Sequence, residues 1–480
     1  MEEKMTQNKN NNGNIIITCA DAITNLIQTF FIFCAHPFVI LAQKVSNRTK
    51  DTMVVISTFL IMLQVYLRQT GVSLFLLGFL DVPNWILYSL FDIIACIIMA
   101  FFAFGSIQGS LKKVKCNPYM VLLWAGFCIF MLISAIFVSL DWAAYTAIFT
   151  IVFPALYFIW QNRRDYNTLF SLVIKGIVIF NVVFIVLSIL FRPVGSQQYS
   201  GMFNNPNSLG QYVTLMMPIF LIHYENSLKK KNKKGVVTSL LGAGTTCAFL
   251  TFSCSRTAIV SVIGIVLVWA GIKLVWERKK EKIRRIAASI LVLAVVCGVA
   301  VPLTWGVIRV GTRMTFSIIM QGQSVDLDSS MGDIFNKLNK RIDTTDKDLN
   351  KLSTHRTIIW EEYISRLSFF GHNRGEIYVV GYGFANTTHN APLQAAYDNG
   401  IAAGVIYAVF NLLSLFLSFQ YYRKNKETDY AKLPFILCVG YTLTSLLASI
   451  IHPFGYGLGF LFWIVQAPLF DRHCEEEKLV

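Results

Sequence analysis

Long apolar runs recur along this chain, and they restrict its fold more than any other feature. Each run extends for roughly 17–25 residues, which lets an α-helix cross the ~30 Å hydrocarbon core of a bilayer. Of the 480 residues, 55% are hydrophobic and only 14% are charged. A soluble protein of this length needs far more polar surface. The sequence therefore predicts an all-α polytopic membrane protein embedded in a lipid bilayer.

About twelve runs are typical of transmembrane helices. They divide the chain into an N-terminal cytoplasmic or interfacial segment, a first membrane domain, a polar loop, a second membrane domain and a tail: 1–51, 52–306, 307–388, 389–471 and 472–480. The expected spans are 52–80, 84–107, 119–139, 143–161, 168–191, 207–224, 237–252, 257–275, 287–306, 396–421, 433–451 and 455–471.

Residues 15–43 are apolar but interrupted by Asp21, Asn25 and Gln28. We expect an interfacial helix or a re-entrant hairpin here, because a thirteenth span would place the N-terminus on the outer side. In the polar loop, residues 321–354 are hydrophilic enough to stay partly disordered until a substrate binds.

Lysine and arginine cluster on every second connection, which the positive-inside rule assigns to the cytoplasm. The clusters lie at 44–50, 112–115, 163–164, 229–234, 273–285 and 423–432. The alternate connections, including the 307–388 loop, then face outward. The formal charge of +15 thus reflects topology and contact with anionic lipids. No basic domain stands outside the membrane, so we expect no nucleic-acid partner.

The ten cysteines indicate neither a disulfide framework nor a metal site. No pair has the spacing of metal ligands, and none lies in the 307–388 loop. Several lie within apolar spans, where cysteine behaves as a small hydrophobic residue: Cys96, Cys128, Cys247, Cys297 and Cys438.

Two short polar stretches reach the outer face before the long loop. In the first, 200–210, Asn207 or Ser208 can cap the next span, and the helix N-terminus either meets an anion or is simply a capped turn. In the second, 253–257, Arg256 stands among small hydroxyl residues. Its guanidinium either makes paired hydrogen bonds to a phosphate or extends along the membrane edge to the lipid headgroups.

The third stretch closes the long loop. Arg356 opens an amphipathic segment in which Trp360 fits an interfacial anchor. Gly381 and Gly383 allow a tight turn back toward the tenth span. His389 lies just before that span, either as a titratable group where membrane meets water or as a solvent-exposed loop histidine.

Arg68 lies deep in the first apolar run with Gln64 and Gln69. A charge there is costly unless it is paired or functional. Three interpretations stay open: contact with a lipid diphosphate, pairing with Asp81 or Asp92, or an interfacial break in the run.

In order, these pieces resemble the O-antigen ligase and oligosaccharide-repeat polymerase superfamily. The resemblance covers about residues 50–470 and rests on Gly-x-Phe-x-Asn-Pro-Asn at 201–207, Ser-Arg at 255–256, Arg-x-x-x-Trp at 356–360, Gly-x-Gly at 381–383 and His-Asn at 389–390. One position departs from the ligase pattern: Gly400 is in register, but Ala403 stands where the pattern has glycine, threonine or tyrosine, with Gly404 one residue later. A polymerase therefore stays open beside a ligase.

The resemblance implies a GT-C-like helical fold in a bacterial plasma membrane, with an active site on the extracytoplasmic face. It implies a metal-independent inverting glycosyltransferase without a cofactor. Such an enzyme transfers a glycan from an undecaprenyl-diphosphate carrier to an acceptor sugar hydroxyl, in the synthesis of capsule, O-antigen or cell-wall glycan. Sugar, acceptor and oligomeric state stay open.

Carried over residue by residue, the resemblance makes His389 the activating group and Arg256 and Arg356 the clamps for the donor's diphosphate, with Arg68 as a further candidate. Preplaced arginines stabilise a leaving diphosphate most in the transition state. A neutral histidine takes the acceptor's proton near pH 7 or only orients the hydroxyl. Substrate-binding candidates in the same motifs are Asn205, Asn207, Asn390 and Gln394.

Two other classes remain as alternatives. A membrane transporter, such as a flippase of lipid-linked oligosaccharides, also suits about twelve spans, but the sequence shows no internal repeat and few charges deep in its spans. A non-catalytic scaffold does not explain why two arginines and a histidine are expected on one side of the membrane.

Overall fold

A computed structural model describes residues 2–70, 84–194, 198–276, 280–319, 330–342, 355–373 and 375–472. Within these residues the chain is almost wholly helical, and its one sheet is a two-stranded hairpin of β1 (Ile377–Val379) and β2 (Gly383–Ala385). Ten helices of the described part are long and apolar enough to cross a membrane. The prediction of an all-α polytopic membrane protein is confirmed.

All twelve predicted spans fall on helical segments. In chain order these are α2 (Asn47–Arg68), α4 (Asn84–Ser106), α5 (Pro118–Phe137), α6 and α7 (Ala143–Ala147 and Phe153–Arg163, joined by a π-helical turn), α8 (Tyr166–Phe191), α9 (Pro206–Lys229), α10 (Lys233–Ser253), α11 (Arg256–Trp276), α12 (Lys280–Ile319), α17 (Ile401–Asn425), α18 (Leu433–Ser445) and α19 (Gly457–Ile464). Residues 71–80 of the first predicted span lie outside the described residues.

Nine of the ten candidate spans coincide with predicted spans, and the tenth lies in α1; three of the predicted twelve, α9, α18 and α19, are not in the set. Helix α9 is less apolar than the candidate spans, but it is buried along almost its whole length. Its polar side chains are tolerated because they face protein and not lipid. Helices α18 and α19 are shorter than a full crossing. They pack inside the bundle, where neighbouring helices and not lipid contact their side chains.

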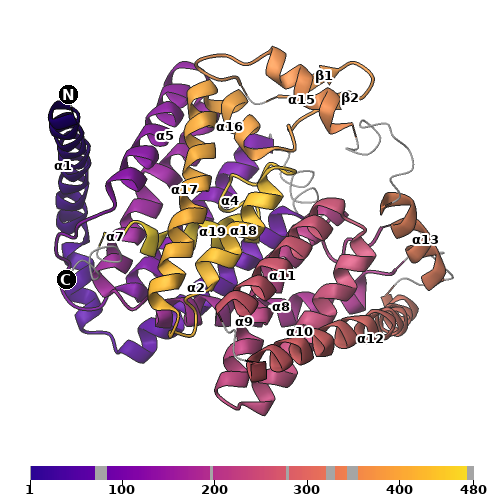
Figure 1. Ribbon diagram of the computed structural model, residues 1–480. Helices are drawn as coiled ribbons and strands as arrows, with labels where there is room; N and C mark the ends of the chain where they lie inside the picture. The colour runs from indigo at the N-terminus through magenta and orange to yellow at the C-terminus, as the bar shows by residue number, and fades with distance from the viewer. Residues whose placement is uncertain are drawn as a thin grey trace.

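The N-terminal segment rules out one of the two forms expected for residues 15–43, the hairpin, and leaves the interfacial helix open. Helix α1 (Glu2–Gln43) is continuous, so it is no re-entrant hairpin, and Ile15–Gln43 is itself a candidate span. Figure 1 shows α1 at the edge of the bundle, beside α5. The polar side chain of Gln28 is tolerated because its amide bonds the carbonyl and the N–H of Val114, both at 2.9 Å. Phe33 is 80% exposed, as expected for a side chain that faces lipid.

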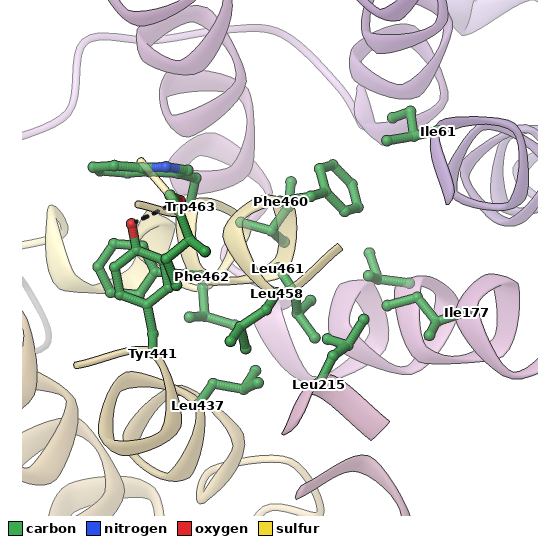
Figure 2. Packing of buried hydrophobic residues seen from close by; sticks show 14 of the residues in the cluster. Ile61, Ile177, Leu215, Leu437, Tyr441, Leu458, Phe460, Leu461, Phe462 and Trp463 are labelled. Atoms are coloured by element: carbon green, nitrogen blue, oxygen red, sulfur yellow. Dashed lines mark hydrogen bonds between the residues drawn. The ribbon is translucent and has the colours of Figure 1, made fainter. Parts of the chain in front are cut away.

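The core of the bundle forms around α19. Tyr441 of α18 stacks on Phe462 with ring centroids 3.6 Å apart, and Trp463 packs edge-on against Phe462. Figure 2 shows Leu437 of α18 near Tyr441, and Leu215 of α9 near Leu458 of α19. Helix α9, buried along almost its whole length, thus packs at the centre of the molecule.

Two predicted spans are broken in the structure. The span expected at 433–451 is helical only to Ser445, and the chain continues through irregular backbone before α19. The carbonyls of Ile450 and Ile451 accept hydrogen bonds from the Tyr441 hydroxyl at 3.2 Å and the Trp463 indole at 3.0 Å. Irregular backbone can lie inside a membrane bundle when protein groups satisfy it in this way.

The tenth predicted span, 396–421, is two helices. Helix α16 (Ala391–Asn399) ends at Gly400, and α17 begins at Ile401. Gly400 has φ 95° and ψ 156°, a conformation reserved for glycine. A Cβ here would also overlap the carbonyl oxygen of Phe369.

The long polar loop is more ordered than expected. Helix α12 continues to Ile319, past the predicted boundary at 306, and residues Met331–Ile342 form helix α13. The other residues of the expected disordered stretch, 321–329 and 343–354, lie outside the described residues. Residues Arg356–Ser365 form α15, the helix that the sequence predicted. We call the end of the bundle that carries α13, α15 and the β1–β2 hairpin the loop end (Figure 1).

The basic connections gather at the opposite end, where α9 finishes at Lys229. There Lys230 pairs with Asp429, and the buried carboxylate of Glu225 lies between Lys432 and Lys273. This separation of the loop end from the basic end agrees with the charge pattern used to orient the chain.

Candidate functional site

The start of α9 brings the first polar stretch to the loop end. Asn205 caps the helix by accepting from the Asn207 N–H at 2.8 Å, with Pro206 in the first turn. The sequence had favoured Asn207 or Ser208 as the cap. Both instead reach neighbours: the Ser255 hydroxyl donates to Asn207 Oδ1 at 3.2 Å, and the Ser208 hydroxyl donates to Gln69 Oε1 at 3.1 Å. Asn205 and Asn207 both line a cavity, as substrate-binding candidates should.

Arg256 opens α11, directly after the turn that ends α10. Cys254 has φ 48° in that turn and reverses the chain. Arg256 Nε donates to the backbone carbonyl of Arg341 on α13 at 2.6 Å, and Arg341 Nη1 donates back to the Cys254 carbonyl at 3.3 Å. The two arginines therefore fix α13 against the α10–α11 turn.

Arg341 is a functional candidate that sequence reasoning missed. Helix α13 has apolar residues at helical spacing, Met331, Ile334, Phe335 and Leu338. This amphipathic pattern is the signal that could have located the helix, and with it Arg341 in its last turn.

Arg356 contacts the start of α11 from the end of the long polar loop. It is the first residue of α15, and its Nη2 donates to the Thr257 hydroxyl at 3.2 Å. Burial lowers the pKa of Arg356, and the charge of Arg256 lowers it further. The structure thus brings Arg256 and Arg356 together at the loop end, although 99 residues separate Arg356 from its partner Thr257.

His389 occupies a tightly held bend before α16. Its backbone φ is 52°, in the left-handed region. The Thr388 carbonyl accepts from the Trp360 indole at 2.8 Å, and the Thr388 hydroxyl donates to the Asn390 carbonyl at 2.7 Å. The β1–β2 hairpin contains the turn expected at Gly381 and Gly383, and it returns the chain to this bend. These contacts hold the histidine backbone in place.

Asn390 and Gln394 support this bend and are not among the lining residues of the neighbouring cavity, so their role as substrate-binding residues stays a prediction. Asn390 caps α16 by accepting from the Leu393 N–H at 2.9 Å and donates to the Leu446 carbonyl at 3.1 Å. Gln394 accepts from the Thr388 N–H at 2.8 Å and donates to Asp398 at 2.8 Å. Their polar groups are committed to the protein.

The His389 imidazole is half-buried and favours its neutral form. Burial is the larger cause that lowers its pKa below the usual 6.5, and the positive charge of Arg356 adds to it. The ring makes no hydrogen bond with any residue in the described part of the chain. Its nitrogens therefore remain open to a molecule in the adjoining cavity.

Two adjoining cavities connect these groups. One, of about 80 Å³, is lined by His389 and Arg356 together with Ser255, and with Thr444 and the residues 447–449 at and after the end of α18. The other, of about 380 Å³, is lined by Arg256, Arg341 and Arg356. Their shared lining residues are Asn205, Asn207, Thr257 and Arg356. We call the pair the arginine groove. No described carboxylate side chain lines it.

Arg68 lies elsewhere. Its Nη1 forms an ion pair with Asp92 Oδ1 at 2.6 Å, and the other oxygen of Asp92 lies 3.2 Å from His452 Nε2. The side chains of Arg68 and Asp92 are only 11% and 6% exposed. Of the interpretations left open by the sequence, pairing with Asp92 is the one that the structure shows. Arg68 lines neither cavity of the arginine groove.

No family model, curated protein or solved structure matches the chain. The arginine groove itself therefore has to indicate the chemistry. Its positive wall suits an anion with several oxygens, since guanidinium groups fork onto phosphate. Its histidine end suits a proton-accepting role near pH 7.

Proposed function

We propose that the protein is a glycosyltransferase similar to O-antigen ligases and oligosaccharide-repeat polymerases. It transfers a glycan from an undecaprenyl-diphosphate carrier to an acceptor sugar hydroxyl, with inversion and without a metal. The observation that carries the proposal is the arginine groove, in which one wall holds Arg256 and Arg356 and the adjoining cavity holds a neutral His389.

The arginines account for the leaving group. As the bond between the anomeric carbon and the phosphate oxygen breaks, negative charge grows on the diphosphate. Guanidinium groups already in place stabilise this charge more in the transition state than in the ground state. Arg356 lines both cavities, which supports assigning it to the phosphate nearest the sugar.

His389 accounts for the acceptor. The acceptor oxygen attacks the anomeric carbon from the face opposite the diphosphate, and its proton passes to an imidazole nitrogen. A base must be neutral to accept that proton, and the lowered pKa of His389 provides this at pH 7. The rigid bend at Thr388–Asn390 keeps the imidazole in position.

Location supports the same reaction. The arginine groove lies at the loop end, and the basic connections lie at the other end. By the positive-inside rule the loop end is extracytoplasmic. The chain then acts at the outer face of a bacterial plasma membrane, where lipid-linked glycans are joined into capsule, O-antigen or cell-wall polymers.

A test in cells follows the lipid-linked donor. In a strain that carries only the Arg356→Ala chain, we expect surface polymer to disappear and undecaprenyl-diphosphate-linked glycan to accumulate. Arg356→Lys should rescue only in part, because an ammonium lacks the planar fork. Arg366→Ala is the matched control, since Arg366 pairs with Glu362 on the same helix and lines neither cavity. Normal polymer in the Arg356→Ala strain would refute the proposal.

A flippase of lipid-linked oligosaccharides is the second candidate, favoured by the break between α18 and α19. Transporters use discontinuous helices of this kind around their substrate sites. The two candidates differ in where the donor accumulates when the protein fails. Loss of a flippase leaves the donor in the cytoplasmic leaflet, and loss of the transferase leaves it in the outer one.

A further inference from the structure

The positive surface does not end at the arginine groove. A third cavity, of about 510 Å³, is lined by Arg192, Lys337, Lys340 and Arg341. It shares Gln198, Asn204, Pro206 and Arg341 with the arginine groove. The two spaces therefore adjoin, and Arg341 lies on the boundary between them.

Helix α13 positions most of these cations. Lys337 and Lys340 are three residues apart, and Arg341 is four residues after Lys337, so all three project from one side of the helix. The helix is anchored by Ile334, which lies one turn before Lys337 and is only 6% exposed within the main core. Arg192 follows the last residue of α8 and faces the same cavity from the other side.

Within the described residues, this arrangement carries unbalanced positive charge. None of the described carboxylates lines the third cavity, and Arg192, Lys337 and Lys340 form no ion pair with any described residue. The one acid on α13, Asp333, accepts from the Ser330 N–H at 2.8 Å and belongs to the start of the helix. Like charges at this spacing repel one another. A bound anion relieves that repulsion, since counter-charge within a few ångströms is the strongest compensation available.

We propose that the third cavity is a second anion subsite, which binds a phosphate or carboxylate group of a substrate whose diphosphate lies in the arginine groove. The inference rests on the proposed function and deepens it. The second anion has two sources, an acidic sugar of the glycan or the phosphate of a second lipid-linked molecule. In both, Arg341 lies between the two bound anions.

The test is a binding measurement on the purified full chain in nanodiscs of uncharged lipid. Two soluble probes represent the two sources: farnesyl diphosphate, and a tetrasaccharide that alternates glucuronic acid with N-acetylglucosamine. The variant is Lys337→Gln with Lys340→Gln. The control is Arg313→Gln, because Arg313 is an exposed cation on α12 that does not line these cavities. Lys337→Arg with Lys340→Arg keeps the charge and reports whether α13 still folds.

We expect the double glutamine variant to lose at least about tenfold in affinity for one probe, since charge-assisted contacts are worth that much or more. If the variant loses affinity for the tetrasaccharide but not for its carboxyl-reduced form, the second anion is an acidic sugar of the glycan. Loss for farnesyl diphosphate identifies a lipid phosphate. The arginine variant and Arg313→Gln should bind within twofold of the unmodified chain.

Affinities within twofold for both probes in the glutamine variant would overturn the second subsite. That outcome is separate from failure of the proposed function, which is read from glycan transfer by Arg356→Ala. The two results are independent. If binding needs Lys337 and Lys340 but Arg356→Ala still transfers glycan normally, the second subsite exists and the proposed mechanism is wrong.

Discussion

Arg356 connects the two cavities of the arginine groove. It bonds Thr257 at the start of α11, lines both cavities and lowers the pKa of His389 by its charge. One side chain therefore has two proposed tasks, holding a leaving diphosphate and keeping the base neutral. A lysine could supply the charge but not the planar geometry.

The pH dependence of His389 follows from its surroundings. Its pKa lies below 6.5 because burial and Arg356 both disfavour the imidazolium. Activity that needs the neutral ring should stay constant from pH 7.5 to about 6.5 and fall as the pH drops through the lowered pKa. Arg356→Gln should raise that pKa, and Arg313→Gln should not. NMR titration of ¹³C-labelled histidine, assigned with His389→Gln, measures both. A titration of the unmodified chain above 6.5 contradicts this account.

Arg68 should behave as a structural residue. Arg68→Ala leaves Asp92 buried without its guanidinium partner, and breaking a buried pair in this way costs about 3–5 kcal/mol. Arg68→Met combined with Asp92→Asn should recover most of the stability. Thermal unfolding of the purified variants checks this, together with their affinity for farnesyl diphosphate. An Arg68→Ala chain that is as stable as the unmodified chain but no longer binds farnesyl diphosphate would instead assign Arg68 to diphosphate binding.

At the scale of elements, the site depends on a break between two helices. Gly400 separates α16 from α17, and its conformation sets the direction in which α16 presents the His389 bend. Helices that begin and end at the loop end, α9 and α11 above all, supply the remaining walls of the arginine groove. The geometry of the arginine groove is thus held by packed helices and not by the loop alone.

Gly400→Ala should therefore disturb both stability and transfer. The backbone conformation alone costs an L-residue on the order of 1–3 kcal/mol, and the added methyl meets the Phe369 carbonyl. Gly306→Ala in α12 is the control, because no heavy atom lies within 4 Å of its Cβ and alanine favours a helix. Unfolding temperature and transfer rate should fall for Gly400→Ala only. Equal behaviour of the two variants would show that the break does not position the site.

Local pattern was enough to predict the helices and the order of the motifs. Apolar runs report lipid contact directly, and capping and turn residues act over a few positions. Arg256, Arg356 and His389 could be assigned to one face because charge bias fixes which connections share a side. Their contacts through Thr257 and the Thr388 bend required the fold.

The errors all involve partners distant in sequence. The N-terminal segment reads as interrupted because Gln28 finds its partner, Val114, 86 residues away. The span after Leu433 reads as continuous because the bonds that satisfy its irregular end come from Tyr441 and Trp463. For Arg68, the sequence left pairing with Asp92 as one of three interpretations, and only the fold places that carboxylate beside it. Single-sequence patterns carry none of this pairing information.

At the scale of the whole molecule, orientation decides whether the arginine groove can meet an acceptor outside the cell. In a cysteine-free background, Ser365→Cys on α15 should react with an impermeant maleimide on intact cells. Lys231→Cys at the basic end should react only after permeabilisation. Both positions are exposed in the structure, so a difference between them reports sidedness and not burial. The reversed pattern would place the groove in the cytoplasm and remove the extracytoplasmic reaction.

The central claim is that His389 and the arginines of the groove transfer a lipid-linked glycan. The most direct measurement is single-turnover transfer by the purified chain, from an undecaprenyl-diphosphate-linked donor to an acceptor glycan, with a chelator present. His389→Ala should slow transfer by about 10²–10⁴-fold, the usual contribution of a general base, while donor affinity stays unchanged. His372→Ala, a loop histidine that lines neither cavity, should retain the full rate. Transfer by His389→Ala within tenfold of the unmodified chain would contradict the account.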